Sequence, residues 1–162
     1  MITISKVKKE NIDEVKKLLS NVWADTYKTI LSEEVINKVT TIWHNPKLLE
    51  AQCELKNTLF IIAKEDNKRI IGLATANVID DKTVNLSRLY VKKEYQRTGI
   101  GNCLLNYIVN EFESARKIQL EVAVGNVKGV NFYAKNNFVA ISSKDEEIEN
   151  EHMDLILMEK YI

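Results

Sequence analysis

Two glycines in a short polar stretch give the clearest chemical signal in the sequence. The run Gln96-Arg97-Thr98-Gly99-Ile100-Gly101 follows an apolar, strand-like segment and leads into a helical segment at Asn102. Glycines let the backbone turn tightly with its amides pointing inward, and a helix N-terminus adds free N–H groups and a positive dipole end. Gln96 and Arg97 add side-chain donors that suit phosphate oxygens. The stretch predicts a pyrophosphate-binding loop, and an incidental strand-to-helix turn is the alternative.

The common phosphate-binding motifs do not fit this loop. No Lys-Ser or Lys-Thr pair follows the second glycine, which argues against a P-loop. The residues Asn102-Cys103-Leu104 also lack the third glycine of a dinucleotide-binding fingerprint. A different phosphate-containing carrier is therefore expected.

A second group of residues lies downstream and completes a recognisable pattern. Asn126, Gly129, Phe132 and Tyr133 precede the pair Asn137-Phe138. The Gln/Arg-x-x-Gly-x-Gly turn after a strand, followed by an Asn-x-x-small-x-x-Phe-Tyr helix and a closing aromatic, resembles the GCN5-related N-acetyltransferase (GNAT) family. The order of elements agrees along essentially the whole chain. Read without the resemblance, Phe132 and Tyr133 are core aromatics at helical spacing.

The resemblance implies a fold and an activity. The fold is α+β, with a mixed, mostly antiparallel central sheet of about seven strands that is splayed in the middle and carries helices on both faces. The activity is transfer of an acetyl group from acetyl-CoA to a primary amine by direct attack on the thioester. Tyr133 matches the tyrosine that many members place near the thioester sulfur, where it is the general acid for the leaving thiolate.

The resemblance also implies which residues hold the cofactor. Backbone groups of the strand end pair with the pantetheine arm and the thioester carbonyl, the glycine-containing loop holds the pyrophosphate, and the downstream helix supplies Asn126 to bond the pantetheine or orient its neighbours. Phe132 packs beside the cofactor. The cofactor-binding set is Leu89, Tyr90, Val91, Gln96, Arg97, Thr98, Gly99, Ile100, Gly101, Asn102, Asn126, Phe132 and Tyr133.

The acceptor end is less well defined by the sequence. Trp23-Ala24-Asp25-Thr26-Tyr27 resembles the segment that many members place over the acceptor, so Trp23, Asp25 and Tyr27 are candidate substrate residues. The general base is open: Asn85 stands near the position where some members carry a glutamate, and it cannot titrate. Glu121 is a candidate acting through a water, with an exposed, ion-paired glutamate as the alternative. His44 and His152 are further candidates, against ordinary packing or surface roles.

The charge pattern favours a polycationic acceptor. The stretch from Lys144 to Glu151 is dense in carboxylates and is expected to be a long acidic loop, with Asp25, Glu33 and Glu34 across from it. Converging carboxylates attract a polycation, and the ending Asp154-Leu155-Ile156-Leu157 resembles bacterial spermidine/spermine acetyltransferases. The expected acceptor is a small amine or polyamine, and an ordinary solvated loop is the alternative interpretation.

Three other functions stay open on sequence alone. They are a protein N-terminal or lysine acetyltransferase, a non-catalytic acetyl-CoA-binding module, and a structural or partner-binding domain in which the glycine turn is incidental. Product analysis separates the first from a small-amine enzyme. The retained Tyr133 argues against the second.

The elements that must position these residues follow from periodicity and turn signals. Within Thr83 to Val91, apolar residues fall on even positions at Val84 and Leu86 and on odd positions at Leu89 and Val91. This slip predicts a β-bulge, with an imperfect strand as the alternative. The expected strands are 2–7, 58–64, 69–78, 83–91, 118–124, 138–143 and 153–161, with a turn at 65–68, and the expected helices are 12–22, 33–39, 46–55, 102–112 and 130–136.

Composition sets the remaining expectations. The chain has 162 residues, which suits one domain covering residues 1–162, and its 23 Lys+Arg balance 23 Asp+Glu, so no net charge draws it to nucleic acid or membrane. Cys53 and Cys103 are too few for a disulfide framework and lack metal-site spacing, so no metal is expected. No signal peptide or membrane-spanning run is visible, which indicates a cytoplasmic protein. Edge strands leave a homodimer open.

Overall fold

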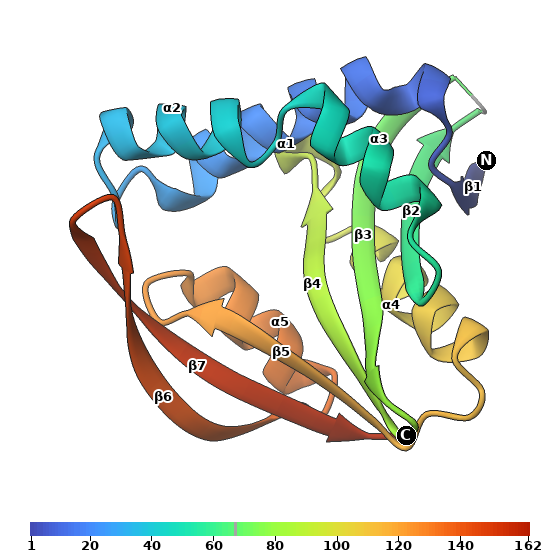
Figure 1. Ribbon diagram of the computed structural model, residues 1–162. Coiled ribbons are helices and arrows are strands. Elements are labelled where there is room, and N and C mark those ends of the chain that lie inside the picture. Colours follow the sequence, from blue (N-terminus) through green and yellow to red (C-terminus); the bar gives the residue numbers. More distant parts are fainter. Residues whose placement is uncertain (67) are drawn as a thin grey trace.

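The computed structural model describes residues 1–66 and 68–162, and within them the chain forms a sheet of seven strands in the order β1-β2-β3-β4-β5-β7-β6 (Figure 1). β4 and β5 run parallel, and the other neighbouring strands pair antiparallel. This confirms the expected mixed, mostly antiparallel sheet. Asn67, part of the turn expected between the second and third strands, lies outside the described residues. The strands are β1 (Ile2–Lys6), β2 (Thr58–Glu65), β3 (Arg69–Asp80), β4 (Thr83–Val91), β5 (Lys117–Ala123), β6 (Val139–Ile148) and β7 (Glu151–Tyr161).

Helices cover both faces of this sheet (Figure 1). α1, α2 and α3 pack on one face and α4 and α5 on the other, each side with its own buried apolar clusters. None of the helices in the described residues is long and apolar enough to span a bilayer. The helices are α1 (Ile12–Tyr27), α2 (Glu33–Ile42), α3 (Pro46–Glu54), α4 (Ile100–Glu111) and α5 (Val127–Lys135), with short 3₁₀ turns at Lys9–Asn11 and Lys93–Tyr95.

The starts of α2 and α3 follow from their capping residues. The Ser32 hydroxyl accepts a hydrogen bond from the Val35 amide at 3.3 Å, and Asn45 Oδ1 accepts one from the Leu48 amide at 3.0 Å. Pro46 occupies the first turn of α3, where its missing N–H costs nothing. Both predicted helix starts are confirmed.

The sheet splays between β4 and β5. The two strands pair through Thr83–Asn85 and Lys117–Gln119 and then diverge, as Figure 1 shows. The predicted bulge lies on the diverging part: Arg88 pairs with Thr75 while Leu86 pairs with Ala76, so Ser87 is the extra residue. Apolar residues on both sides of the bulge, Leu86 and Leu89 among them, therefore pack into the same α4-side cluster. The slip in the sequence pattern is a real bulge.

The acidic stretch is not the long loop that the sequence predicts. β6 continues through Ile148, β7 begins at Glu151, and only Glu149 and Asn150 connect them, at φ angles of 50° and 67°. Two residues at positive φ make the tight turn that suits a hairpin. Ile148 and Met153 anchor the tip in the cluster below α2. Because β6 is an edge strand, its charged side chains reach solvent, and they also discourage pairing with another chain.

Candidate active site

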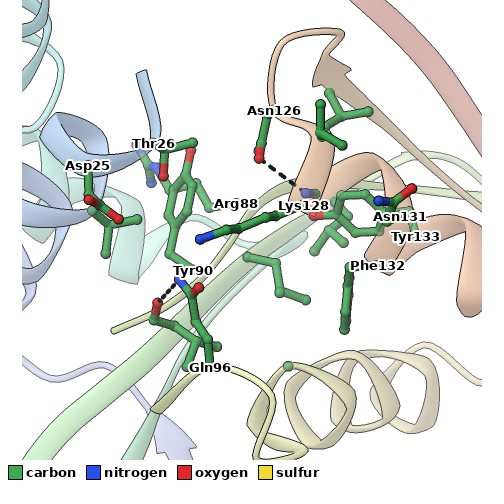
Figure 2. A pocket seen from close by; sticks show the side chains of 18 of the residues that line it. Asp25, Thr26, Arg88, Tyr90, Gln96, Asn126, Lys128, Asn131, Phe132 and Tyr133 are labelled. Carbon is green, nitrogen blue, oxygen red and sulfur yellow. Dashed lines mark hydrogen bonds between the residues drawn. The ribbon is translucent and has the colours of Figure 1, made fainter. Parts of the chain in front are cut away.

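The divergence of β4 and β5 opens a cleft of about 1020 Å³. Its walls come from the end of α1, from β4, from the loop before α4, from β5 and from α5 (Figure 2). Most of the residues expected at the site line it, whereas the Trp23, Thr98 and Ile100 side chains do not. The predicted residues that line the cleft are Asp25, Tyr27, Leu89, Tyr90, Val91, Gln96, Arg97, Gly99, Gly101, Asn102, Glu121, Asn126, Phe132 and Tyr133.

The glycine-containing loop is shaped by its backbone. Gly99 caps α4 with a φ of 90°, a conformation that glycine adopts without strain, and Arg97 also has a positive φ of 64°. The Thr98 hydroxyl donates to the Tyr95 carbonyl at 2.6 Å, and Gln96 Nε2 donates to the Val91 carbonyl at 3.1 Å. Both side chains thus hold the loop to its own backbone and to the end of β4.

The first turn of α4 faces the cleft. The helix begins at Ile100, two residues earlier than expected, so Gly101 and Asn102 lie in its first turn and line the cleft. The N–H groups of a first turn have no partner inside their helix and suit an anion. A Cβ on Gly101 would lie 3.0 Å from Cε2 of Phe132. Glycine is needed here because the Phe132 ring packs directly on the helix start.

β4 presents unpaired backbone to the cleft. On one side, β3 continues its register with Leu73 opposite Tyr90 and Ala74 opposite Leu89. On the other side β5 has diverged, so alternate N–H and C=O groups of this part of β4 point into the cleft. An extended amide chain can pair with such an edge.

α5 begins three residues earlier than expected because Asn126 caps it. Asn126 Oδ1 accepts a hydrogen bond from the Gly129 amide at 3.1 Å, drawn as a dashed line in Figure 2. A Cβ on residue 129 would come within 2.6 Å of Asn126 Nδ2, so Gly129 leaves room for the cap. The cap fixes the start of the helix that carries Phe132 and Tyr133.

Tyr133 points into the cleft from α5 (Figure 2). Its side chain is 9% exposed, and its ring meets those of Phe132 and Phe138 edge-on, with centroids 5.3 and 5.5 Å apart. Burial raises the pKa of Tyr133. The phenol therefore stays protonated at neutral and moderately alkaline pH, as a proton donor requires.

Both expected carboxylates at the acceptor end are paired with lysines. Asp25 Oδ1 lies 3.3 Å from Lys28 Nζ and 3.6 Å from Lys93 Nζ, and the hydrogen bond from Lys28 lowers the pKa of Asp25. Glu121 Oε1 lies 2.8 Å from Lys144 Nζ. Glu121 has the exposed, ion-paired state that the sequence offered as the alternative, and its role as a base acting through a water stays a prediction.

Trp23 does not line the cleft but packs against Tyr27, which does. Its ring centroid lies 4.3 Å from that of Tyr27, which lines the cleft, and 5.5 Å from that of His44. Trp23 itself is buried in the cluster between α1, α2 and the hairpin of β6 and β7.

The other candidates for a general base, His44 and His152, lie away from the cleft, as does Asn85, which cannot titrate. Asn85 sits where β4 and β5 still pair, and its Nδ2 is 3.5 Å from Asn77 Oδ1. His44 is buried, and burial lowers its pKa to about 4. His152 lies on the exposed hairpin with Nδ1 2.6 Å from Asp145 Oδ2, and this hydrogen bond raises the pKa of His152.

The sequence did not predict three cationic residues that line the cleft. They are Arg88 from β4 and Lys128 and Lys135 from α5, of which Figure 2 labels Arg88 and Lys128. The bulge at Ser87 was the available signal, because it turns Arg88 to the same face as Tyr90 and away from Leu89. The pattern of apolar residues alone gave Arg88 no role.

Comparison with known proteins decides the family. Residues 27–162 match the family model described as an acetyltransferase (GNAT) domain. The chain belongs to the GNAT family. It is therefore an acetyl-CoA-dependent N-acetyltransferase, as the sequence predicted. No non-catalytic or purely structural role is needed to explain the glycine turn.

Individual GNAT relatives agree along the whole chain. A spermidine N(1)-acetyltransferase of Thermoplasma acidophilum is 30% identical over 167 residues, covering 99% of this chain and 98% of the relative. The crystal structure of the PaiA N-acetyltransferase of Thermoplasma acidophilum in complex with coenzyme A is 26% identical, with a TM-score of 0.85, covering 100% and 99% of the two chains. The ribosomal-protein-S18-alanine N-acetyltransferase of Escherichia coli shares the fold at 19% identity, with a TM-score of 0.74 and coverage of 100% and 94%.

Proposed function

We propose that this GNAT enzyme transfers the acetyl group directly to the primary amine of a small molecule, with Tyr133 as general acid. The observation that carries the proposal is the buried, protonated phenol of Tyr133 in the cleft where β4 and β5 diverge. The thioester of acetyl-CoA supplies the electrophilic carbonyl. As the neutral amine nitrogen bonds to that carbon and the C–S bond breaks, Tyr133 donates its proton to the departing thiolate, and the proton lost by the nitrogen returns to the phenolate directly or through water.

The cleft residues suit a ligand with an amide arm and a pyrophosphate. We propose that the exposed edge of β4 at 89–91 pairs with the arm and polarises the thioester carbonyl through an N–H group. Phe132 covers the arm from the side of α5. The pyrophosphate lies on the loop and first turn at 96–102, where Arg97 adds charge. Thr98 and Ile100 contribute backbone only, because the Thr98 hydroxyl is bonded to Tyr95 and Ile100 is buried.

The proposed acceptor is a small amine, and polyamines are the first class to test. The name of the Thermoplasma acidophilum relative supports this class. The charges of the cleft do not add support, since Asp25 and Glu121 are each paired with lysine. The acidic stretch is likewise folded into a hairpin whose tip carboxylates contact α2: Glu149 pairs with Lys38, and Glu151 accepts from the Ser32 amide.

Two measurements on the same purified protein test this proposal. Calorimetry with acetyl-CoA is followed by free-thiol release with a panel of polyamines, other small amines, amino acids and short peptides, and the products are identified by mass spectrometry. We expect saturable binding and thiol release that depends on a small primary amine. Release that requires a peptide or protein amine would contradict the small-molecule acceptor, and binding without turnover on any amine would contradict the enzyme role.

A further inference from the structure

Arg88 is a charged residue of the cleft, and it has no charged partner in the part of the chain that the structure describes. It lies on β4 next to the bulge, is partly buried, and lines the acceptor half of the cleft (Figure 2). Its Nη1 donates to Gln52 Oε1 at 2.5 Å, and its guanidinium carbon lies 5.9 Å from the centroid of the Phe60 ring. Among residues 1–66 and 68–162, no carboxylate forms an ion pair with Arg88.

The surroundings of Arg88 do not neutralise its charge. Thr75 is its partner in the register of β3 and β4, and the buried Thr75 hydroxyl has no hydrogen-bond partner among the described residues. Within the same described residues, His44 Nδ1 is also buried without a partner. The pKa of His44 is lowered first by burial and then by Arg88, which keeps the ring neutral. A buried charge is costly unless it is paired and hydrogen-bonded. Gln52 uses one of the five guanidinium N–H donors, and the described residues give the guanidinium no second hydrogen bond.

The rest of the acceptor end does not favour a ligand made only of ammonium groups. Lys128 reaches into the cleft from α5, opposite Arg88 (Figure 2). Asp25 and Glu121, the carboxylates of this end, are already paired with lysines. The acceptor end therefore lacks the complementary negative charge that a polycation would require.

We propose that Arg88 binds a carboxylate of the acceptor, so that the acceptor carries a carboxylate as well as the primary amine that is acetylated. A guanidinium binds a carboxylate through two parallel hydrogen bonds. Arg88 lies two residues before Tyr90, roughly 6–7 Å along an extended strand from the edge proposed to bind the thioester. One small molecule can span that separation. This inference rests on the proposed small-amine acceptor, and within that class it favours amines that carry a carboxylate over polyamines.

Matched amines that differ by one carboxylate test the inference directly. Lysine and cadaverine form one pair, and ornithine and putrescine form another, the second member lacking only the carboxylate. We expect the wild-type kcat/KM to be about 10- to 100-fold higher for the amino acid of each pair, as a charged hydrogen-bonded contact implies. Equal values, or a preference for the diamine, would overturn the inference.

Variants of Arg88 test whether this residue causes the preference for the amino acid over the diamine. Arg88→Gln is expected to remove it by lowering kcat/KM for the amino acids while changing that for the diamines less than about threefold. Arg88→Lys is expected to restore part of it, because lysine keeps the charge but not the two-pronged geometry. Lys128→Gln removes the other cation of this end but leaves the guanidinium, so it is expected to shift the preference in the same direction by much less than Arg88→Gln does. Acetyl-CoA binding by calorimetry verifies that each variant is folded.

Two outcomes would contradict the role of Arg88. An equal loss on both members of a pair in Arg88→Gln would mean that the residue only supports the structure. Acetylation of diamines alone would overturn the inference and leave the proposed small-amine enzyme intact. Failure to acetylate any small amine, with acetyl-CoA still bound, would instead overturn the proposed function itself.

Discussion

The two ends of the cleft are built in different ways. The end proposed to bind the cofactor is made of backbone: the positive-φ turn at Gly99, the first turn of α4 and the unpaired edge of β4. The end proposed to bind the acceptor is made of side chains, among them Arg88, Lys128 and two ion-paired carboxylates. A backbone site needs few residue types at fixed spacing, whereas a side-chain site depends on neighbours that are far apart in the sequence. The first is therefore tied to the shared reaction and the second to the individual acceptor.

At the end made of backbone, a larger side chain is expected to weaken acetyl-CoA binding by steric overlap. In Gly101→Val, the new side chain would meet the Phe132 ring, which lies 3.0 Å from the position of a Cβ. We expect the Kd for acetyl-CoA to rise about 10- to 100-fold, in line with the cost of overpacking. Calorimetry measures the Kd, and Cys103→Val, at an exposed position of the same helix, is the control that should leave it unchanged.

A double substitution sharpens this prediction. If the clash with Phe132 is the cause, Gly101→Val combined with Phe132→Leu should recover part of the lost affinity, which a double-mutant cycle detects as coupling between the two sites. Strictly additive losses would show that Gly101 acts independently of Phe132.

α5 carries residues of both ends of the cleft, Lys128 and Phe132, and Asn126 caps the start of this helix. Asn126→Ala removes the hydrogen bond to the Gly129 amide and is expected to lower the free energy of unfolding by about 1 kcal/mol. Asn126→Asp keeps a capping oxygen and should retain most of the stability. Chemical denaturation measures both variants, and an Asn126→Ala variant as stable as the wild type would show that the cap does not hold the helix.

The smallest expected effect is a pH dependence of the Tm that comes from one ion pair in the hairpin of β6 and β7. The hydrogen bond to Asp145 raises the pKa of His152, so the charged pair stabilises the fold below the ordinary histidine pKa, and this contribution is lost as pH rises through the raised value. Compared with His152→Gln, the wild type should show a slightly higher Tm near pH 5.5 and the same Tm near pH 8.5. A difference in Tm between the wild type and His152→Gln that grew with pH would contradict stabilisation by protonated His152.

The sequence predicted the cofactor end better than the acceptor end for a physical reason. Gly99 and Gly101, the slip of alternation around Ser87 and the Asn126-to-Tyr133 helix are local patterns, and the structure shows the turn, the bulge and the helix there. The sequence did not predict the hairpin of β6 and β7 because the charged residues before Ile148 obscure the apolar–polar alternation of a strand. Ile148 and Met153 are its buried apolar residues near the turn. Lys93 and Lys144 could not be assigned from the sequence to Asp25 and Glu121, because the fold brings them together from distant positions, whereas Lys28 lies only three residues after Asp25.

The central claim is that Tyr133 provides the proton that releases the thiolate, and one variant tests it most directly. Tyr133→Phe keeps the ring in its contacts with Phe132 and Phe138 and removes only the hydroxyl. With the best amine of the panel, we expect kcat from thiol release to fall about 100- to 1000-fold, while the Kd for acetyl-CoA changes less than about threefold. Tyr107→Phe, outside the cleft, should leave both values unchanged. An unaltered kcat in Tyr133→Phe would contradict the account.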